Sequence, residues 1–141
     1  MPTATSFTDV PLHLLRRALQ RYTAVWNREV PELTAPQYAV LIALAGASDS
    51  DQTALAHSTG VDRATMTPLL DRLAGHGYVQ RVSDPRNRRR KVIQLTEEGQ
   101  ELLARIAPAA ERAHNWAYDT VGEEGVRTLM PLLRTLAGLD A

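Results

Sequence analysis

Apolar residues recur every three or four positions near the start of the chain. Over residues 11–30 these positions are Leu12, Leu15, Leu19, Tyr22 and Trp26, which is the spacing of one face of an amphipathic helix. Pro31 ends that helix. A similar pattern near the end of the chain, at Val126, Leu129, Met130, Leu133 and Leu136, predicts a final amphipathic helix.

The stretch "TAPQYAVLIALAG", residues 34–46, predicts a second helix. Thr34 and Gln37 have the spacing of a capping box, and Pro36 suits the first helical turn. Gly46 ends the helix. Because this helix is apolar on most sides, we expect it to lie at the centre of the fold.

Two shorter helices follow, over residues 52–58 and 63–74, with Asp51 and Asp62 as their caps. The turn "TGV" between them completes a helix-turn-helix. In the second of these helices four residues have the spacing of a buried face: Met66, Leu69, Leu70 and Leu73. Pro68 is expected to bend or tighten the start of the helix without ending it.

The segments "YVQRV" and "VIQLT" have the composition and alternation of strands, and they predict a hairpin, or wing, with a basic tip. Thr96 is expected to cap a long helix that extends to Ala117 with a kink at Pro108, and Gly122 separates it from the final helix. The predicted fold is mainly α with a two-stranded β wing: a winged helix-turn-helix flanked by N- and C-terminal dimerisation helices.

The first and last helices carry longer apolar stripes than a small winged core needs, so a two-fold interface between two copies would bury both. The residues expected in this interface are Leu12, Leu15, Leu19, Trp116, Leu129, Leu133 and Leu136. The predicted division is a dimerisation helix in residues 1–33, a winged helix-turn-helix lobe in residues 34–96 and further dimerisation helices in residues 97–141, all in one structural unit.

Charge is distributed unevenly along a chain whose net charge is zero. Residues 52–95 hold eight basic and three acidic side chains, whereas residues 96–141 hold four basic and eight acidic ones. Five cations crowd into residues 86–91, where they repel one another unless a polyanion is bound. A basic hairpin directly after a helix-turn-helix indicates nucleic-acid binding.

Double-stranded DNA is therefore the expected partner. The helix that begins at Asp62 is expected to lie in the major groove, where Arg63 can pair with guanine and threonines can contact base edges. The residues expected to face DNA on this helix are Asp62, Arg63, Thr65, Thr67 and Arg72, with Arg72 on a phosphate or paired with Asp71 or a neighbouring helix. In the wing they are Arg86, Asn87, Arg88, Arg89, Arg90 and Lys91.

The segments "LLDRLAGHGYVQR", "DPRNRR" and "LTEEG", in this order, resemble the MarR (multiple antibiotic resistance regulator) family across essentially the whole chain. The resemblance implies a homodimeric winged-helix regulator, usually a repressor of nearby genes, that binds an inverted-repeat operator. It matches Arg89 to the wing arginine that enters the minor groove. The family's second wing acid is replaced here by Asn87, whose amide can still hydrogen-bond Arg89 without charge assistance.

The resemblance also implies a small effector, often a phenolic or aromatic carboxylate. Candidates for its pocket are Tyr22, Trp26, Tyr38, Leu41 and His57, with Arg16 or Arg17 for a carboxylate. Core packing is the alternative interpretation for each aromatic side chain, and His114 and Trp116 are open to both interpretations.

Other functions find little support in the sequence. The four histidines are scattered without a nucleophile or a phosphate-binding loop, so an enzyme is not expected. No cofactor is expected either, and the absence of cysteine excludes disulfides and thiol-based sensing. A metal-responsive regulator using His13, Glu111 and His114, and a winged helix that binds protein instead of DNA, remain alternatives. Without a signal peptide or a long apolar run, a cytoplasmic protein with no membrane contact is the expectation.

Overall fold

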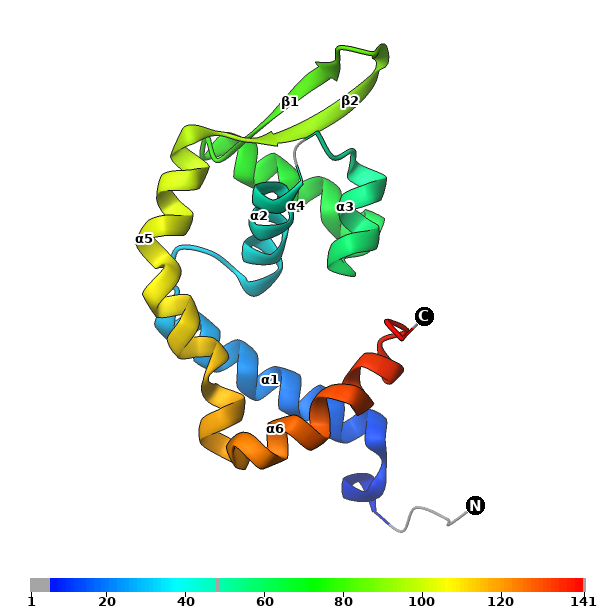
Figure 1. The fold of residues 1–141 in the computed structure, drawn as a ribbon, viewed down its shortest axis with the longest axis vertical. Helices are drawn as coiled ribbons and strands as arrows, with labels where there is room; N and C mark the ends of the chain where they lie inside the picture. Colours follow the sequence, from blue (N-terminus) through cyan, green and yellow to red (C-terminus); the bar gives the residue numbers. More distant parts are fainter. Residues whose placement is uncertain (1–5, 48, 141) are drawn as a thin grey trace. The chain divides into compact units, whose positions relative to one another are not determined.

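The computed structural model describes residues 6–47 and 49–140, which form a mainly helical protein with a small antiparallel sheet (Figure 1). In chain order the elements are η1 (Phe7–Asp9), α1 (Pro11–Glu29), α2 (Ala35–Gly46), α3 (Gln52–Thr59), α4 (Arg63–Gly75), β1 (Val79–Asp84), β2 (Asn87–Leu95), α5 (Glu97–His114) and α6 (Trp116–Leu136). The predicted fold class is confirmed. The chain divides into two compact units: Val30–Pro108 forms one, and the segments before and after it form the other.

Side-chain caps fix the starts of the helices in the unit Val30–Pro108. Thr34 and Gln37 form the predicted capping box of α2, with hydrogen bonds of 3.2 Å and 2.9 Å. The carboxylates of Asp51 and Asp62 each accept a backbone N–H at 2.7 Å, from Ala54 and Thr65, and thereby cap α3 and α4. These caps satisfy amides that have no partner within the helix, so local sequence determines where each helix begins.

The core of this unit forms around the buried face of α4. Met66, Leu69, Leu70 and Leu73 are buried, as their spacing predicts. They share the core with residues of α2, α3 and β2, including Val40, Leu41, Leu44, Leu55, Val92 and Ile93. Pro68 lies exposed within α4, and the helix continues through it. The helix-turn-helix is thus fixed by apolar packing on one side only, which leaves the other side of α4 exposed.

Strands β1 and β2 form the predicted hairpin, which extends beyond the helices α2, α3 and α4 (Figure 1). The sequence predicted that the cations lie between the strands, but β2 begins at Asn87 and therefore contains most of them. A further contact was not predicted: the backbone N–H of Ile93 donates to the carbonyl of Ser50 at 2.8 Å, which forms an isolated antiparallel bridge. The segment before α3 is thereby attached to the wing strand.

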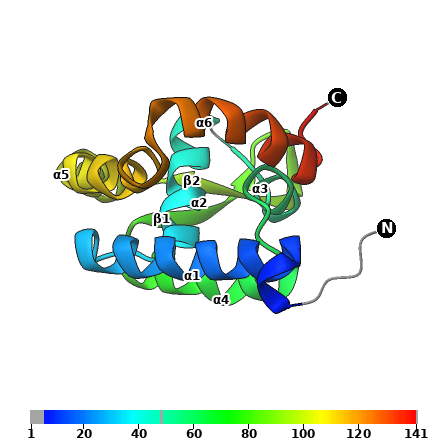
Figure 2. The same cartoon turned by 90° about the horizontal axis from the view of Figure 1, so that it is seen from below.

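In the other unit, the C-terminal half of α1 packs against the junction of α5 and α6. Trp26 is fully buried, and its ring centroid lies 5.6 Å from that of His114 and 6.4 Å from that of Tyr22. Tyr22 also lies 6.0 Å from Trp116. These distances are typical of aromatic packing. Beyond this cluster α1 and α6 form two separate layers in Figure 2.

The end of the long helix differs from the prediction. α5 ends at His114, and Trp116 and Ala117 begin α6, because the backbone at Asn115 (φ −70°, ψ −9°) departs from regular helix geometry. Gly122 (φ 76°, ψ 173°) interrupts α6, which confirms the predicted break at this residue.

In the part of the chain that the structure describes, no helix is long and apolar enough to cross a membrane.

Gly99, in the first turn of α5, lies so close to the base of the hairpin that a side chain does not fit. The Thr96 hydroxyl accepts the Gly99 N–H at 3.1 Å and donates to the carbonyl of Gly77 at 2.6 Å, which holds α5 against the base of the hairpin. A Cβ at Gly99 would overlap the carbonyl oxygen of Tyr78 and would lie 2.6 Å from Cδ1 of Leu95. No side chain fits here without backbone movement.

We expect Gly99→Ala to lower the free energy of unfolding by about 1–3 kcal/mol, because the backbone must move to relieve the overlap. Gly75→Ala is the matched control, since Gly75 ends α4 and a Cβ there would meet no atom within 4 Å. Urea denaturation of both variants measures the difference. Equal stability of the two variants would contradict the close approach at Gly99.

Candidate nucleic-acid interface

The N-terminal half of α4 presents polar side chains to solvent. Asp62 caps the helix, and Arg63, Thr65 and Thr67 are exposed. Because successive residues of a helix are about 100° apart, burial of Met66 places Thr65 and Thr67 on the two flanks of the buried face. Arg63 is exposed because it is the first residue of the helix, before the buried face begins. The predicted recognition surface is thus an exposed face in the structure.

Two residues of α3 that the sequence pattern did not identify contact this face. Gln52 Nε2 donates to Thr67 Oγ1 at 2.6 Å, and the Arg63 guanidinium donates to Thr53 Oγ1 at 2.9 Å. Both contacts join the first turn of α3 to α4 and orient the side chains that would meet a base edge. Gln52 and Thr53 could have been identified from the sequence, because both are polar and begin the first helix of the helix-turn-helix.

Arg72 is exposed in the last turn of α4. Its neighbour Asp71 pairs instead with Arg81 of β1, at 2.7 Å between Oδ1 and the guanidinium nitrogen. This ion pair joins α4 to the hairpin on the solvent side, in addition to the apolar contact beneath it. The ion pair between Arg72 and Asp71, which the sequence suggested as an alternative, does not occur in the structure.

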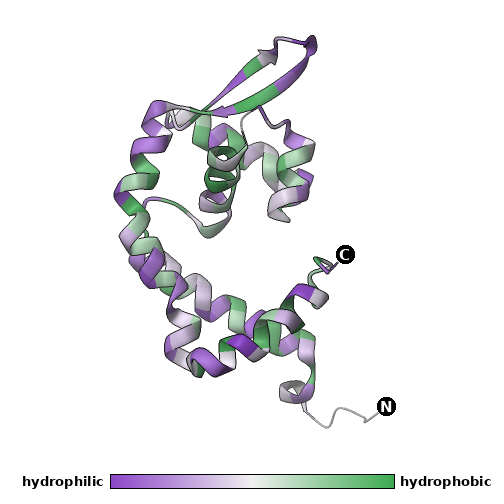
Figure 3. Ribbon diagram, viewed as in Figure 1, coloured by the Kyte–Doolittle hydropathy of each residue, from purple (hydrophilic) through white to green (hydrophobic). Residues whose placement is uncertain are grey.

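The hairpin turns at Pro85 and Arg86, so the register places Asp84 opposite Asn87. Ser83 is opposite Lys91, and this irregularity leaves Arg88, Arg89 and Arg90 as extra residues in β2. Extra residues of this kind bend a strand and redirect its side chains. Figure 3 shows the tip of the hairpin in the colour of hydrophilic residues.

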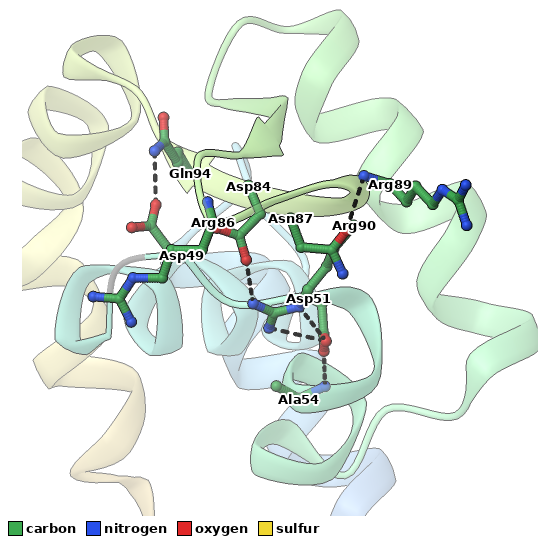
Figure 4. Close-up of polar contacts among 9 residues, drawn as sticks. All are labelled: Asp49, Asp51, Ala54, Asp84, Arg86, Asn87, Arg89, Arg90 and Gln94. Atoms are coloured by element: carbon green, nitrogen blue, oxygen red, sulfur yellow. Dashed lines mark hydrogen bonds and ion pairs between the residues drawn. The ribbon is translucent and has the colours of Figure 1, made fainter.

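Short-range hydrogen bonds shape the tip. Asp84 Oδ1 accepts the backbone N–H of Arg86 at 2.9 Å, and Asn87 Oδ1 accepts the backbone N–H of Arg89 at 3.2 Å (Figure 4). Asn87 therefore hydrogen-bonds Arg89 through the main chain, which differs from the amide–guanidinium contact considered from the sequence. The Arg89 side chain points away from the polar cluster in Figure 4.

The five cations of the wing are not equivalent. The guanidinium of Arg90 pairs with Asp51 at 3.0 Å and with Asp84 at 2.9 Å, and the Lys91 ammonium donates to the Ser83 hydroxyl at 2.9 Å. Among the residues that the structure describes, the side chains of Arg88 and Arg89 make no ion pair. The wing thus combines locally bonded cations with exposed ones.

These contacts change the ionisation of the two carboxylates. The pKa of Asp51 lies below its usual value, because the N–H of Ala54 and then the Arg90 guanidinium donate to it. The pKa of Asp84 is lowered by the N–H of Arg86 and then by Arg90. Asp62 also has a lowered pKa, chiefly because the N–H of Thr65 donates to it. Hydrogen bonds to the charged form of a carboxyl group favour that form.

The residues expected in the effector pocket belong to both units. Arg16 and Arg17 are exposed on α1, and Tyr22 and Trp26 belong to the aromatic cluster of that unit. In the other unit, Tyr38 is half-buried and Leu41 is buried on α2, while His57 is exposed on α3. A hollow of about 290 Å³ in the unit of α1 is lined by Val25, Arg28, Glu29, Arg112, Asn115, Trp116 and Asp119, and it includes none of the seven predicted residues.

The residues expected in the dimer interface lie on α1 and α6. Leu12, Leu19 and Leu136 are 64%, 62% and 68% exposed, Leu15 and Leu129 are also exposed, and Trp116 and Leu133 are half-buried. A shallow hollow of about 410 Å³ on α6 is lined by Val121, Glu124, Gly125, Thr128, Leu129 and Leu132. Exposed apolar surface of this extent usually marks an interaction site.

Among the residues that the structure describes, no cluster of three or more histidine, aspartate or glutamate side chains is placed to hold a metal ion. His13, Glu111 and His114, which the sequence suggested as metal ligands, therefore form no such cluster.

A helix-turn-helix with an exposed basic hairpin defines this protein as a winged-helix DNA-binding protein. The sequence model of the MarR family matches residues 33–91. The transcriptional regulator HosA of Escherichia coli O111:H- is 35% identical over 124 residues, which cover 88% of this chain and 92% of HosA. The chain therefore belongs to the MarR family of transcription regulators, which are DNA-binding proteins and not enzymes.

Solved structures support the same assignment. BpsR of Bordetella bronchiseptica, whose DNA binding is regulated by 6-hydroxynicotinic acid, is 29% identical with a TM-score of 0.90, over 99% of each chain. The transcriptional repressor CouR of Rhodococcus jostii RHA1, bound to a 23-mer DNA duplex, is 27% identical with a TM-score of 0.85, over 97% of this chain and 99% of CouR.

The lowered pKa of Asp84 predicts how stability depends on pH. A carboxyl group whose pKa is lower in the folded protein than in the unfolded chain stabilises the fold at any pH above the pKa of the unfolded chain. This stabilisation is lost as the pH falls through the pKa of the folded protein. When the pH falls below 3.8, the ordinary pKa of an aspartate, the wild-type protein should therefore lose this stabilisation. Asp84→Asn cannot ionise and lacks the stabilisation at every pH. Urea denaturation of both proteins across the acid range measures this, and parallel pH profiles would contradict it.

Proposed function

We propose that this protein is a homodimeric repressor that binds an inverted-repeat operator in double-stranded DNA and is released by a small aromatic acid or phenol. The observation that carries the DNA-binding part is the combination of an exposed polar face on α4 with a wing whose Arg88 and Arg89 are exposed. The repressor CouR, which was solved bound to DNA, supports the repressor assignment.

In this proposal α4 lies in the major groove. Arg63 leaves Thr53 and donates two hydrogen bonds to guanine O6 and N7, while Thr65 and Thr67 contact base edges or a thymine methyl group. Asp62 maintains the helix start through its bond to Thr65. Arg72, at the other end of the helix, contacts a phosphate and so positions the helix without reading sequence.

The wing contacts the adjacent minor groove. Arg89 enters the groove, where arginine favours narrow, strongly negative segments of DNA. Arg86 and Arg88 contact phosphates on either side, and Asn87 holds the turn. These contacts depend on groove shape and charge, so they contribute affinity to many sequences.

The apolar faces of α1 and α6 support a homodimer. A two-fold interface that buries Leu12, Leu19 and Leu136 would remove an extensive exposed apolar surface from water. Such a dimer presents two α4 helices about 34 Å apart, which matches successive major grooves on one face of DNA. The operator is then an inverted repeat.

The effector proposal has separate support. BpsR, whose DNA binding is regulated by an aromatic hydroxy acid, resembles this chain over nearly its whole length. In the unit of α1, the side chains proposed to contact the ring are Tyr22 and Trp26. Arg16 or Arg17 would pair with the carboxylate.

Fluorescence anisotropy with the DNA beside this protein's own gene, and with a scrambled duplex, tests the DNA-binding proposal over a series of salt concentrations. We expect selective binding that weakens steeply with salt. Arg89→Ala should weaken binding to all sequences and reduce the log–log salt slope by about 0.9 for each phosphate that Arg89 neutralises. Arg105→Ala is the control, because it removes an equal charge from an exposed position on α5.

Arg63→Ala should act differently from Arg89→Ala in the same assay. Removal of a bidentate guanine contact should relax the preference at one base pair of each half-site, at a cost of about 1–3 kcal/mol. A uniform loss of affinity across operator variants would instead assign Arg63 to a phosphate. If the wild-type protein shows no preference for any duplex, the proposed sequence-specific function is wrong.

The dimer proposal predicts that Leu19→Glu separates the two copies. Burial of an unpaired carboxylate in the interface should weaken association by about 3 kcal/mol or more, and operator affinity should fall with it. Ala24→Glu places the same charge at an exposed position on another face of α1 and serves as the control. Sedimentation analysis measures the association, and an equal response of the two variants would exclude this face from the interface.

A further inference from the structure

We propose that Arg90 is a positioning residue that fixes the wing to the start of α3, and that it is not itself a DNA contact. This inference rests on the proposed DNA-binding function, because the wing it positions is the one that would enter the minor groove. Three side chains form the arrangement, which we call the wing bridge: Asp51, Asp84 and Arg90.

The guanidinium of Arg90 uses its three nitrogens on two carboxylates. Nε and one terminal nitrogen donate to Asp51 Oδ2 at 3.1 Å and 3.0 Å, and the other terminal nitrogen donates to Asp84 Oδ2 at 2.9 Å. Figure 4 shows the Arg90 guanidinium close to both acids while Arg89 points away. A guanidinium engaged in this way must break charge-assisted hydrogen bonds before it can bind a phosphate.

Each carboxylate of the wing bridge also has a second, local role. Asp51 caps α3 with Oδ1, which accepts the Ala54 N–H, and binds Arg90 with Oδ2. Asp84 holds the wing turn with Oδ1, which accepts the Arg86 N–H, and binds Arg90 with Oδ2. Arg90 therefore connects the helix cap directly to the turn of the wing, across 39 residues of sequence.

Two more contacts join the same segment to β2, farther from the tip of the wing. The Ile93 N–H donates to the Ser50 carbonyl at 2.8 Å, and Gln94 Nε2 donates to Asp49 Oδ1 at 2.7 Å. Arg90 is the contact nearest the tip, beyond which the wing is a two-stranded hairpin. Since isolated two-stranded hairpins are marginally stable in water, the position of Arg88 and Arg89 depends on this contact.

Removal of an acidic charge from the wing bridge tests the inference. A positioning role and a role as simple surface charge predict opposite changes in DNA affinity. Removing a carboxylate from a DNA-binding surface ordinarily strengthens binding, because repulsion of the phosphates falls. If Asp51 and Asp84 position the wing through Arg90, removing either charge should weaken binding instead. Asparagine is suited to both sites, because its side-chain oxygen can still cap α3 or hold the wing turn.

The experiment measures operator affinity by anisotropy for Asp51→Asn, Asp84→Asn and Arg90→Met. We expect each variant to bind about three- to tenfold more weakly, the range for partly exposed, charge-assisted pairs. Glu101→Gln, which removes an exposed acid from α5, is the control and should bind as well as or slightly better than wild type. In a background that carries both Arg88→Ala and Arg89→Ala, Arg90→Met should have little further effect, because the side chains that Arg90 positions are already absent.

Two results would overturn the inference. Asp51→Asn and Asp84→Asn could bind as tightly as Glu101→Gln, or Arg90→Met could weaken binding equally with and without Arg88 and Arg89, as an independent DNA contact would. A readout without DNA separates this inference from the proposed function. Hydrogen–deuterium exchange of the amides in residues 84–91 should be faster in Arg90→Met and Asp84→Asn than in wild type, and unchanged exchange would refute the bridge even if no operator were found.

Discussion

The burial of one face of α4 is the constraint on which the proposed DNA-binding surface depends. Met66, Leu69, Leu70 and Leu73 have no alternative partner in water, so the helix cannot rotate without exposing them. The polar side chains that α4 presents are therefore oriented by apolar side chains that face away from the proposed DNA. The hairpin that follows begins with the buried Val79, so the same core fixes the base of the wing.

The wing shows how a chain can concentrate cations at moderate cost. Repulsion among five neighbouring positive charges would destabilise a hairpin, and the structure reduces it by pairing Arg90 with two acids. Arg88 and Arg89 then remain available for a polyanion. A count of basic residues consequently overestimates the charge that the wing offers to DNA, because part of that charge already serves the fold.

Much of this architecture could be predicted from the sequence because its signals are local. Caps such as Thr34 and Asp62, the spacing of the buried leucines and the break at Gly122 each depend on a few neighbouring residues. The contacts that were not predicted join distant segments: Ser50 to Ile93, Gln52 to Thr67 and Arg90 to Asp51. The irregular register of the hairpin also could not be predicted. The alternation of apolar and polar residues identifies a strand, but it does not show where one strand contains extra residues. The residues proposed for an effector site had no local signal in the sequence, since aromatic side chains pack in cores as readily as they bind ligands.

Gly122 has a consequence for α6 that extends beyond the break itself. Its backbone torsions, φ 76° and ψ 173°, belong to a region that essentially only glycine occupies. Each later side chain of the helix points about 100° around the axis from the one before, so the azimuth at which the helix resumes determines where all of them point. The direction of the apolar stripe through Val126, Leu129 and Leu133 is therefore set by a residue that has no side chain and does not belong to the stripe.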